Sequence, residues 1–163
     1  MLKNEYLIVY LLINSFLLSA QNINVNNIDI VRDSFGVPHI YTKTDAELAY
    51  GLAWAHAEDD FKTIQEAYLA GNSLLSKHIG LRGAPIDFVS QLIRPDDTID
   101  SLYKTLDKNF LKVVEGYAKG LNSFAKNHPE EVLVEKLFPV TPRKMLKYSL
   151  LQLFIFSEGE KAV

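Results

Sequence analysis

The chain has 163 residues, of which 48% are hydrophobic and 23% charged, a balance typical of one soluble globular domain. The formal net charge is −3, so no surplus of Lys and Arg exists to neutralise phosphates, and we expect no nucleic-acid partner. The chain contains no Cys, which excludes disulfides, thiolate metal sites and a Cys nucleophile.

The first 20 residues have the pattern of a secretory signal peptide. Lys3 supplies a positive charge, residues 7–18 form an uncharged and mostly apolar run, and the small residues Ser19-Ala20 follow, as at a signal-peptide cleavage site. A membrane anchor is the alternative, but this run is shorter than the roughly 20 residues that span a bilayer, so we expect no stable membrane insertion. We therefore predict a signal peptide over residues 1–20, a polar leader over residues 21–27, and a periplasmic or secreted protein.

Residues 28–41 predict a β-hairpin. Ile28 and Ile30 alternate with more polar neighbours, as in a half-buried strand. Asp33 and Gly36 occupy the first and fourth positions of a type I turn. Pro38 lacks an N–H group, so we expect it on an unpaired edge or at the start of the returning strand.

A helix is predicted from residue 44 to about residue 69. Thr44 and Glu47 form a capping box, and Gly71-Asn72 is a stop signal. The first half of this helix is apolar all round, including the line that carries Leu48 and Leu52, so we expect it to be central in the fold. The second half is expected to be partly solvated.

The remaining helices are predicted from caps and periodicity. Residues 71–100 are mixed, with one short helix over residues 73–78. Asp107 caps a helix that runs to about residue 126 and contains Gly116 and Gly120, one turn apart. Each Gly costs nearly 1 kcal/mol against Ala in a helix interior, so the pair predicts close packing of another backbone.

The last predicted helix begins with Thr141 as N-cap and Pro142 as its first residue. From residue 150 to residue 156 it is apolar on nearly every side, which is typical of a core or an interface. Few elements follow to cover it. We interpret this as a sign that a partner segment is missing.

Several short motifs follow one another along the chain in a fixed order. They are Ile30-Val31-Arg32-Asp33, Gly36-Val37-Pro38-His39-Ile40, Tyr50-Gly51, His56-Ala57-Glu58-Asp59, Gly71, Gly80, Gly116-Tyr117-Ala118-Lys119-Gly120-Leu121-Asn122 and Phe138-Pro139-Val140-Thr141-Pro142. This series resembles the first part of the α-chain of the penicillin acylase family of N-terminal-nucleophile amidases, which includes acyl-homoserine-lactone acylases. One departure is Asp60, where the family usually has Arg.

The resemblance implies a precursor of several hundred residues, with a signal peptide, an α-chain, a spacer and a β-chain. In the family, a Ser freed at the β-chain's N-terminus attacks the amide and its own α-amine serves as base, while backbone and Asn donors hold the oxyanion. Calcium commonly braces the two chains. The implied fold class is α+β, mainly helical: residues 28–163 would form a β-hairpin followed by helices, an incomplete portion of a four-layer αββα fold.

The resemblance assigns no catalytic residue to this chain. The family's nucleophile follows a Gly, and no Gly-Ser, Gly-Thr or Gly-Cys dipeptide is present. The calcium-ligating Glu is expected beyond Val163, because Glu158 and Glu160 come too early in register. We therefore predict no catalytic residue, metal ligand or cofactor here, and the substrate-binding residues are unknown.

One group of polar residues has both a functional and a structural interpretation. His56, Glu58, Asp59 and Asp60 could suggest a metal cluster, but their spacing lacks the His-Glu-x-x-His pattern, and a paired polar patch inside a helical core is favoured. Asp59 then needs a donor, either a backbone N–H or Arg32.

His39 as a general base, and Arg32-Asp33 as a binding site for a substrate carboxylate, are both less favoured than structural roles. The apolar helix over residues 150–156 could line an acyl pocket or pack against the missing β-chain, and the two roles are compatible.

The sequence therefore predicts the N-terminal fragment of a secreted amidohydrolase that cleaves the linear amide bond of acylated amines. Examples of such substrates are β-lactams that carry an acyl side chain, acyl-homoserine lactones, and similar compounds. The fragment lacks the nucleophile and is inactive alone, and its partner is the β-chain or downstream segment. Whether it is a truncated gene, a split gene or a partial sequence stays open. The alternative is a stand-alone secreted helical binding or regulatory module without catalysis.

Overall fold

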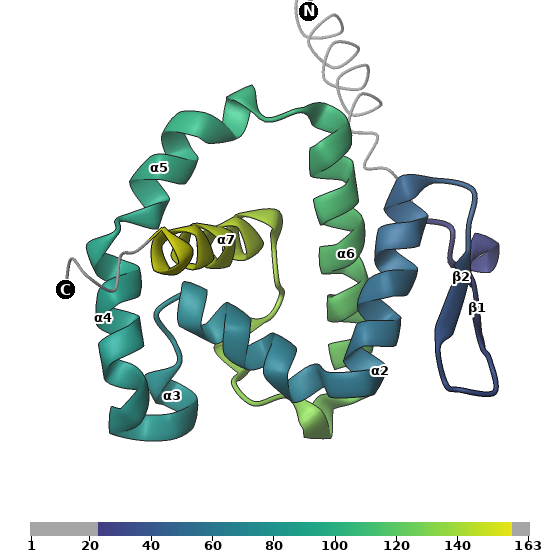
Figure 1. Cartoon of the computed structure of the whole chain (residues 1–163), viewed down its shortest axis with the longest axis horizontal. Helices are drawn as coiled ribbons and strands as arrows, with labels where there is room; N and C mark the ends of the chain where they lie inside the picture. Colours follow the sequence, from purple (N-terminus) through teal and green to yellow (C-terminus); the bar gives the residue numbers. More distant parts are fainter. Residues whose placement is uncertain (1–22, 158–163) are drawn as a thin grey trace, which may run out of the picture.

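A β-hairpin and a layer of helices make up residues 23–157, the part of the chain that this computed structural model describes (Figure 1). The elements in order are β1 (Asp29–Arg32), β2 (Pro38–Tyr41), α2 (Asp45–Gly71), α3 (Ser76–Ile79), α4 (Ala84–Leu92), α5 (Pro95–Leu102), α6 (Lys108–Asn127) and α7 (Pro142–Phe156), joined by short 3-10 turns. The predicted fold class, mainly helical with an N-terminal hairpin, is confirmed. The predicted signal peptide over residues 1–20, Glu158 and Glu160 lie outside the described residues.

The hairpin has the predicted turn. β1 and β2 pair antiparallel with Ile30 opposite Ile40, and Pro38 is the first residue of β2. The Gly36 N–H donates to the Asp33 carbonyl at 3.0 Å, and Gly36 adopts φ +81°, a left-handed conformation that Gly accepts without steric cost. The inner face of the hairpin lies on α2, where a Cβ at Gly51 would stand 2.8 Å from Ile40.

Helix α2 begins as predicted but is bent in the middle. The Thr44 side chain accepts from the Glu47 N–H at 3.3 Å, while the Glu47 carboxylate accepts from the Lys43 N–H. Asp60 has non-helical backbone angles, and its carboxylate accepts from the Thr63 N–H at 3.0 Å, so it caps a second helical stretch. The prediction of one unbroken helix is therefore wrong, because the short Asp side chain competes for the backbone at this point.

The first half of α2 is less enclosed than predicted. Leu48 and Leu52 are 43% and 37% exposed, because α6 covers the opposite side of the helix and the hairpin covers the part near Gly51. The side facing α6 forms the core, with Ala53, Ala57, Phe61, Leu121 and Phe124 buried together.

Helices α2 and α6 meet backbone to backbone, as the paired glycines predict. A Cβ at Gly116 would meet the Ala46 carbonyl oxygen closer than real Cβ contacts come, and a Cβ at Gly120 would meet the Tyr50 carbonyl oxygen in the same way. Both glycines are buried. Their two missing side chains are what lets α6 lie along the first half of α2.

The segment between α2 and α6 was predicted to be a mixed region with one short helix over residues 73–78, but it contains two further helices, α4 and α5. Helix α3 covers residues 76–79 instead, and α4 and α5 carry the chain around α7 (Figure 1). Pro85 and Pro95 lie in the first turns of α4 and α5, where Pro is tolerated. The Asp87 side chain fixes α3 to α4 by accepting from the Leu75 and Ser76 N–H groups at 2.8 and 2.9 Å.

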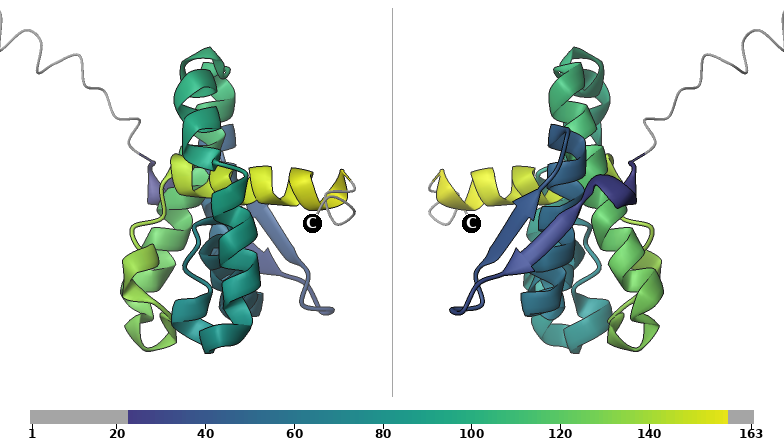
Figure 2. Two further views of the ribbon diagram at one scale, coloured as in Figure 1. Left: turned by 90° about the vertical axis from the view of Figure 1, so that its left-hand side faces the viewer. Right: turned by 90° about the vertical axis from the view of Figure 1, so that its right-hand side faces the viewer.

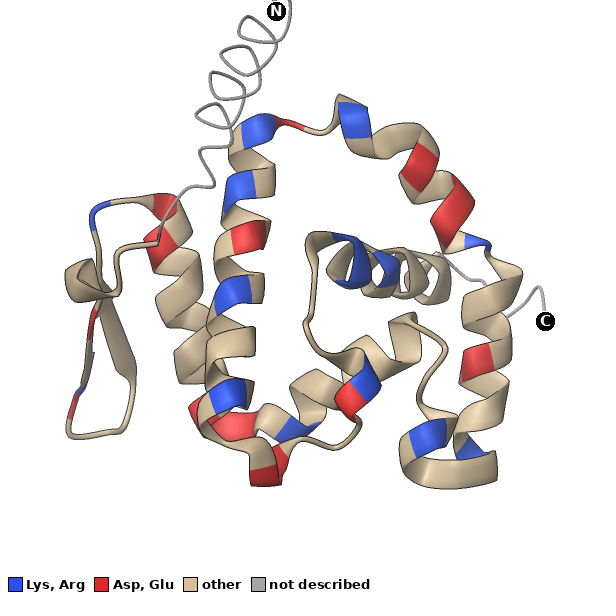
Figure 3. Cartoon of the chain, turned by 180° about the vertical axis from the view of Figure 1, so that it is seen from behind, with Lys and Arg blue, Asp and Glu red and all other residues tan. Residues whose placement is uncertain are grey.

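Helix α7 crosses the end of α2 and projects from the helical layer. It begins with Thr141 as N-cap and Pro142 in the first turn, as predicted. A Cβ at Gly71 would lie 2.6 Å from the Tyr148 backbone nitrogen, and the Asn72 side chain donates to the Lys144 carbonyl at 3.0 Å. Figure 3 shows that the charged residues of α7 are confined to its first half. Leu151 is buried, but Leu153 and Phe156 are 66% and 81% exposed.

We predict that Gly116→Ala destabilises the fold by about 1–3 kcal/mol, although Ala is the better helix former, because the new methyl group meets the Ala46 carbonyl. The exposed neighbour Glu115 provides the control, and Glu115→Ala should have an effect below about 0.5 kcal/mol. Urea unfolding followed by circular dichroism measures both. Stabilisation by Gly116→Ala would contradict the close helix contact.

Candidate functional site

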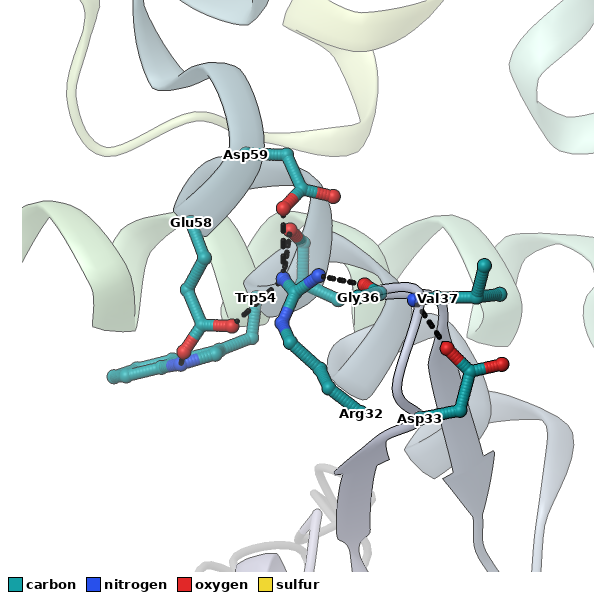
Figure 4. A network of polar contacts seen from close by, with 8 residues as sticks. Arg32, Asp33, Gly36, Val37, Trp54, Glu58 and Asp59 are labelled. Atoms are coloured by element: carbon teal, nitrogen blue, oxygen red, sulfur yellow. Dashed lines mark hydrogen bonds and ion pairs between the residues drawn. The ribbon is translucent and has the colours of Figure 1, made fainter.

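Arg32, at the end of β1, ties the hairpin to α2 (Figure 4). Its Nη1 donates to the Gly36 carbonyl at 2.8 Å, and its Nη2 lies 3.1 Å from Glu58 and 2.8 Å from Asp59. The same Nη2 donates to the Ala55 carbonyl at 3.4 Å. The hydrogen bonds to Glu58 and then to Asp59 raise the pKa of Arg32. We call this set of contacts the Arg32 clamp.

The acidic side of the clamp is itself attached to the core. The Trp54 Nε1–H donates to Glu58 at 3.0 Å, one helical turn away on α2. The Trp54 ring packs edge-to-face on Phe124 of α6, with ring centroids 5.3 Å apart. The clamp therefore connects the hairpin through α2 to α6. The sequence reasoning missed Trp54, whose i, i+4 spacing from Glu58 was the available signal.

The hairpin turn is organised by Asp33. Its carboxylate accepts from the Phe35 and Val37 N–H groups at 2.9 and 3.0 Å, and the His39 Nε2 lies 3.3 Å from it. The bonds from Val37 and Phe35 lower the pKa of Asp33 below its ordinary value. Arg32 and Asp33 are thus engaged in an ion pair and a turn, the structural roles that the sequence favoured.

The four residues considered as a metal cluster do not converge. His56 Nδ1 lies 3.0 Å from the Tyr117 hydroxyl, Glu58 and Asp59 face Arg32, and Asp60 caps a helical stretch. Within residues 23–157 no group of three or more His, Asp or Glu side chains is placed to hold a metal ion. Of the two donors expected for Asp59, a backbone N–H or Arg32, the structure shows Arg32. The patch lies at the surface rather than inside a core, since the Glu58 and Asp59 side chains are 41% and 56% exposed.

Each of the four His rings contacts a group other than the Ser or Thr hydroxyl that a general base would activate. His39 faces Asp33, His56 faces Tyr117, and His78 lies 3.2 Å from Glu66. His128 Nδ1 lies 3.1 Å from the Phe124 carbonyl oxygen. None of these partners is a Ser or Thr hydroxyl. The arrangement holds elements together, and among the described residues no His is paired with a Ser or Thr hydroxyl.

Two hollows flank α7. One, of about 150 Å³, lies between α5 and α7 and is lined by Thr98, Ile99, Leu102, Tyr103, Leu106, Leu146, Ser149, Leu150 and Leu153. The other, of about 400 Å³, lies at the end of α2 and includes Asp96, paired with Lys147 at 2.6 Å, and Asp97, paired with Arg94. The charges of the second hollow are thus engaged with one another.

We expect Arg32→Lys to loosen the hairpin without unfolding the helices, because the ammonium group cannot reproduce the planar fork that contacts Gly36, Glu58 and Asp59. Amide hydrogen exchange of Val31 and His39, the pair whose N–H groups face the other strand, should accelerate several-fold, while exchange in α6 stays unchanged. Arg82→Lys, at an exposed position in the turn before α4, is the matched control. Unaltered hairpin exchange in Arg32→Lys would show that the clamp does not hold the hairpin.

Acidification should open the hairpin turn. Because folding lowers the pKa of Asp33, its stabilising contribution is complete above the ordinary Asp pKa of about 3.9 and is lost as pH falls below it. The amide proton shifts of Phe35 and Val37 should therefore titrate in NMR spectra with a midpoint below about 3.9. Asp33→Asn should remove that titration. A midpoint at or above the ordinary value would contradict the turn geometry.

Comparison with known proteins places these residues in one family. The sequence model of the penicillin amidase family ("Penicillin amidase") matches residues 27–159. Penicillin G acylase from Escherichia coli is 24% identical over 135 residues, which cover 80% of this chain and 16% of that protein. Acyl-homoserine lactone acylase PvdQ from Pseudomonas fluorescens strain Pf0-1 is 23% identical over 116 residues, covering 66% of this chain and 15% of that protein.

The fold is also found in a solved acylase structure. The thermostable penicillin G acylase from Alcaligenes faecalis superposes with a TM-score of 0.66 at 19% identity, covering 78% of this chain and 72% of the solved chain. The chain spans about a sixth of the length of the curated relatives it matches. On the match to residues 27–159, most of its length, the chain belongs to the penicillin amidase family.

Proposed function

We propose that the chain is the N-terminal part of the α-chain of an exported amidohydrolase, and that it supplies scaffold to an enzyme that cleaves the linear amide bond of acylated amines. The observation that carries this proposal is the Arg32 clamp. The motif residues Arg32 and Asp59 pair across the hairpin and α2, and Asp33 accepts from the Val37 N–H within the hairpin turn. They hold the structure that the family shares and leave the chemistry to other residues.

The substrate class follows from the family and its relatives. The matched relatives are named as penicillin G acylases and acyl-homoserine lactone acylases, so an acylated amine is the substrate type that we propose for the complete enzyme. A β-lactam side chain and an acyl-homoserine lactone both contain the required linear amide. The nucleophile would be supplied by a partner, the β-chain or downstream segment.

Metal binding and location are proposed from the resemblance and the N-terminal sequence. The carboxylates of Glu58 and Asp59 face Arg32 and do not suit a calcium site, so the calcium ligands of the complete enzyme are proposed to follow Val163. The signal-peptide pattern over residues 1–20 supports a periplasmic or secreted location. In residues 23–157, no helix has the length and apolar character needed to cross a membrane.

A stand-alone helical binding or regulatory module is the second candidate. It is favoured by the buried cluster around Phe61, Leu121 and Phe124, which shows that the described residues build a core of their own. It is disfavoured by the exposed apolar end of α7. Gel filtration and melting of residues 21–163 separate the two: the fragment proposal predicts self-association or non-cooperative melting, and a monodisperse, cooperatively melting monomer supports the module.

We predict that the purified chain hydrolyses neither penicillin G nor an acyl-homoserine lactone above the buffer rate, because we assign the nucleophile to the partner polypeptide. Release of the free amine, followed by liquid chromatography, measures the reaction. His39→Ala and His56→Ala serve as controls for an unrecognised site. If the chain turns over either substrate and one of these variants abolishes that turnover, the scaffold proposal is wrong.

A further inference from the structure

The buried residues of helix α4 are polar, whereas apolar side chains of the same helix face the solvent. Asp87 and Ser90 are its buried residues. The Ser90 hydroxyl donates to the Ala70 carbonyl at 2.7 Å, and the Asp87 carboxylate accepts from the N–H groups of residues 75 and 76. These hydrogen bonds attach the inner face of α4 to α2 and α3. A surface helix normally shows the opposite pattern, with its apolar side inward.

The outer face of α4 is an apolar stripe. Leu81, in the turn before the helix, is 89% exposed, while Phe88 and Leu92 are 62% and 55% exposed. Pro85 is exposed as well, so these positions follow the three- and four-residue spacing of one helix face. We call Leu81, Pro85, Phe88 and Leu92 the α4 stripe. Apolar side chains that gather on one exposed face indicate an interaction site.

The α4 stripe lies at the edge of the helical layer. In the left view of Figure 2, which looks onto that edge, no other described element stands in front of α4. A helix of nine residues is about 13 Å long. A face of that length and one helix wide is much smaller than the ~800 Å² that each partner buries in a typical stable protein interface. The stripe by itself therefore suits an extended apolar surface better than a protein partner.

The charges next to the stripe are positive (Figure 3). Lys77 and Arg82 are exposed, and no carboxylate within residues 23–157 forms an ion pair with either. Arg94 follows the stripe and pairs with Asp97. Asp87 is the only acidic residue from position 73 to position 94, and it is buried and bonded to backbone N–H groups. A negatively charged partner complements this edge.

We propose that the α4 stripe docks on the surface of a bilayer that contains anionic lipid. Phe88 and the two leucines of the stripe enter the boundary between headgroups and acyl chains, while Lys77 and Arg82 contact lipid phosphates. Apolar side chains on one face with Lys and Arg beside them are the pattern of helices that lie in this boundary. Attachment through one short helix is reversible and involves no membrane-spanning segment. The inference goes beyond the proposed function and does not depend on it.

Flotation of the whole chain with lipid vesicles tests the apolar contact. The vesicles contain phosphatidylglycerol and phosphatidylcholine in equal parts. Leu81→Ser combined with Phe88→Ser should lower the apparent vesicle affinity about tenfold, because it removes the most exposed apolar area of the stripe.

The matched control for this pair is Phe35→Ser combined with Leu153→Ser. These residues are also one Phe and one Leu, and they are 89% and 66% exposed, but they lie in the hairpin turn and on α7. The control pair should bind as the wild type does. All variants share residues 1–22, so any contribution of that segment cancels in the comparison. Circular dichroism checks that the variants keep the fold.

Charge substitutions test the electrostatic contact. Lys77→Gln combined with Arg82→Gln should weaken binding about tenfold, because each Lys or Arg near an anionic surface adds to the attraction. Lys108→Gln combined with Lys112→Gln, at exposed positions of α6, changes the net charge equally and should have little effect. High salt should weaken binding of the wild type, because it screens the same attraction.

Several results would overturn the inference. They are a wild-type chain that does not float with anionic vesicles, equal binding to vesicles of phosphatidylcholine alone, and equal losses in a stripe pair and its control. Binding that disappears in a complex with the polypeptide encoded downstream of residue 163 would show that protein covers the stripe, and would overturn it as well. Each of these results leaves the proposed amidase function standing.

Discussion

Close backbone contact with α2 is the constraint on which the rest of the structure depends. Gly51 admits the hairpin on one side of α2, Gly116 and Gly120 admit α6 on another, and Gly71 admits α7 at its end. At each of these four positions a Cβ would come too close to its neighbour. All four glycines belong to the motif series by which the chain resembles its family. Part of the family pattern therefore marks the positions where hairpin side chains and the backbones of α6 and α7 pack closely on α2.

The charged residues of the same pattern serve the same architecture. Arg32 joins the hairpin to Glu58 and Asp59, and Asp33 closes the turn that positions Gly36 and Val37. Because these groups are occupied by one another, we propose that they identify the family without performing its reaction. Asp60, where the family usually has Arg, instead caps the second half of α2. We propose that the catalytic groups of the complete enzyme belong to polypeptide outside residues 23–157.

Features fixed by local chemistry could be predicted from the sequence, and features that depend on neighbours could not. The hairpin turn, the caps Thr44, Asp107 and Thr141, and the close approach at Gly116 follow from groups a few residues apart or from one missing side chain. The helices α4 and α5 were missed because residues 71–100 contain Gly and Pro residues that also occur in loops, although Pro85 and Pro95 each lie in the first turn of a helix. The exposure of Leu48 and Leu52 was missed because helix periodicity does not say which sides of α2 have neighbours. At the candidate site, Arg32 was one of the two donors expected for Asp59. The Trp54 bond to Glu58 could have been read from their i, i+4 spacing, whereas the contact of His56 with Tyr117 required the packing of α2 against α6.

The central claim is that this chain is scaffold for chemistry encoded elsewhere. Sequencing the DNA downstream of codon 163 in the source genome tests it most directly. We predict a coding sequence, in the same or a neighbouring frame, for the remainder of a penicillin amidase with a Gly followed by the nucleophilic Ser. A genome in which no such sequence accompanies this gene would contradict the claim.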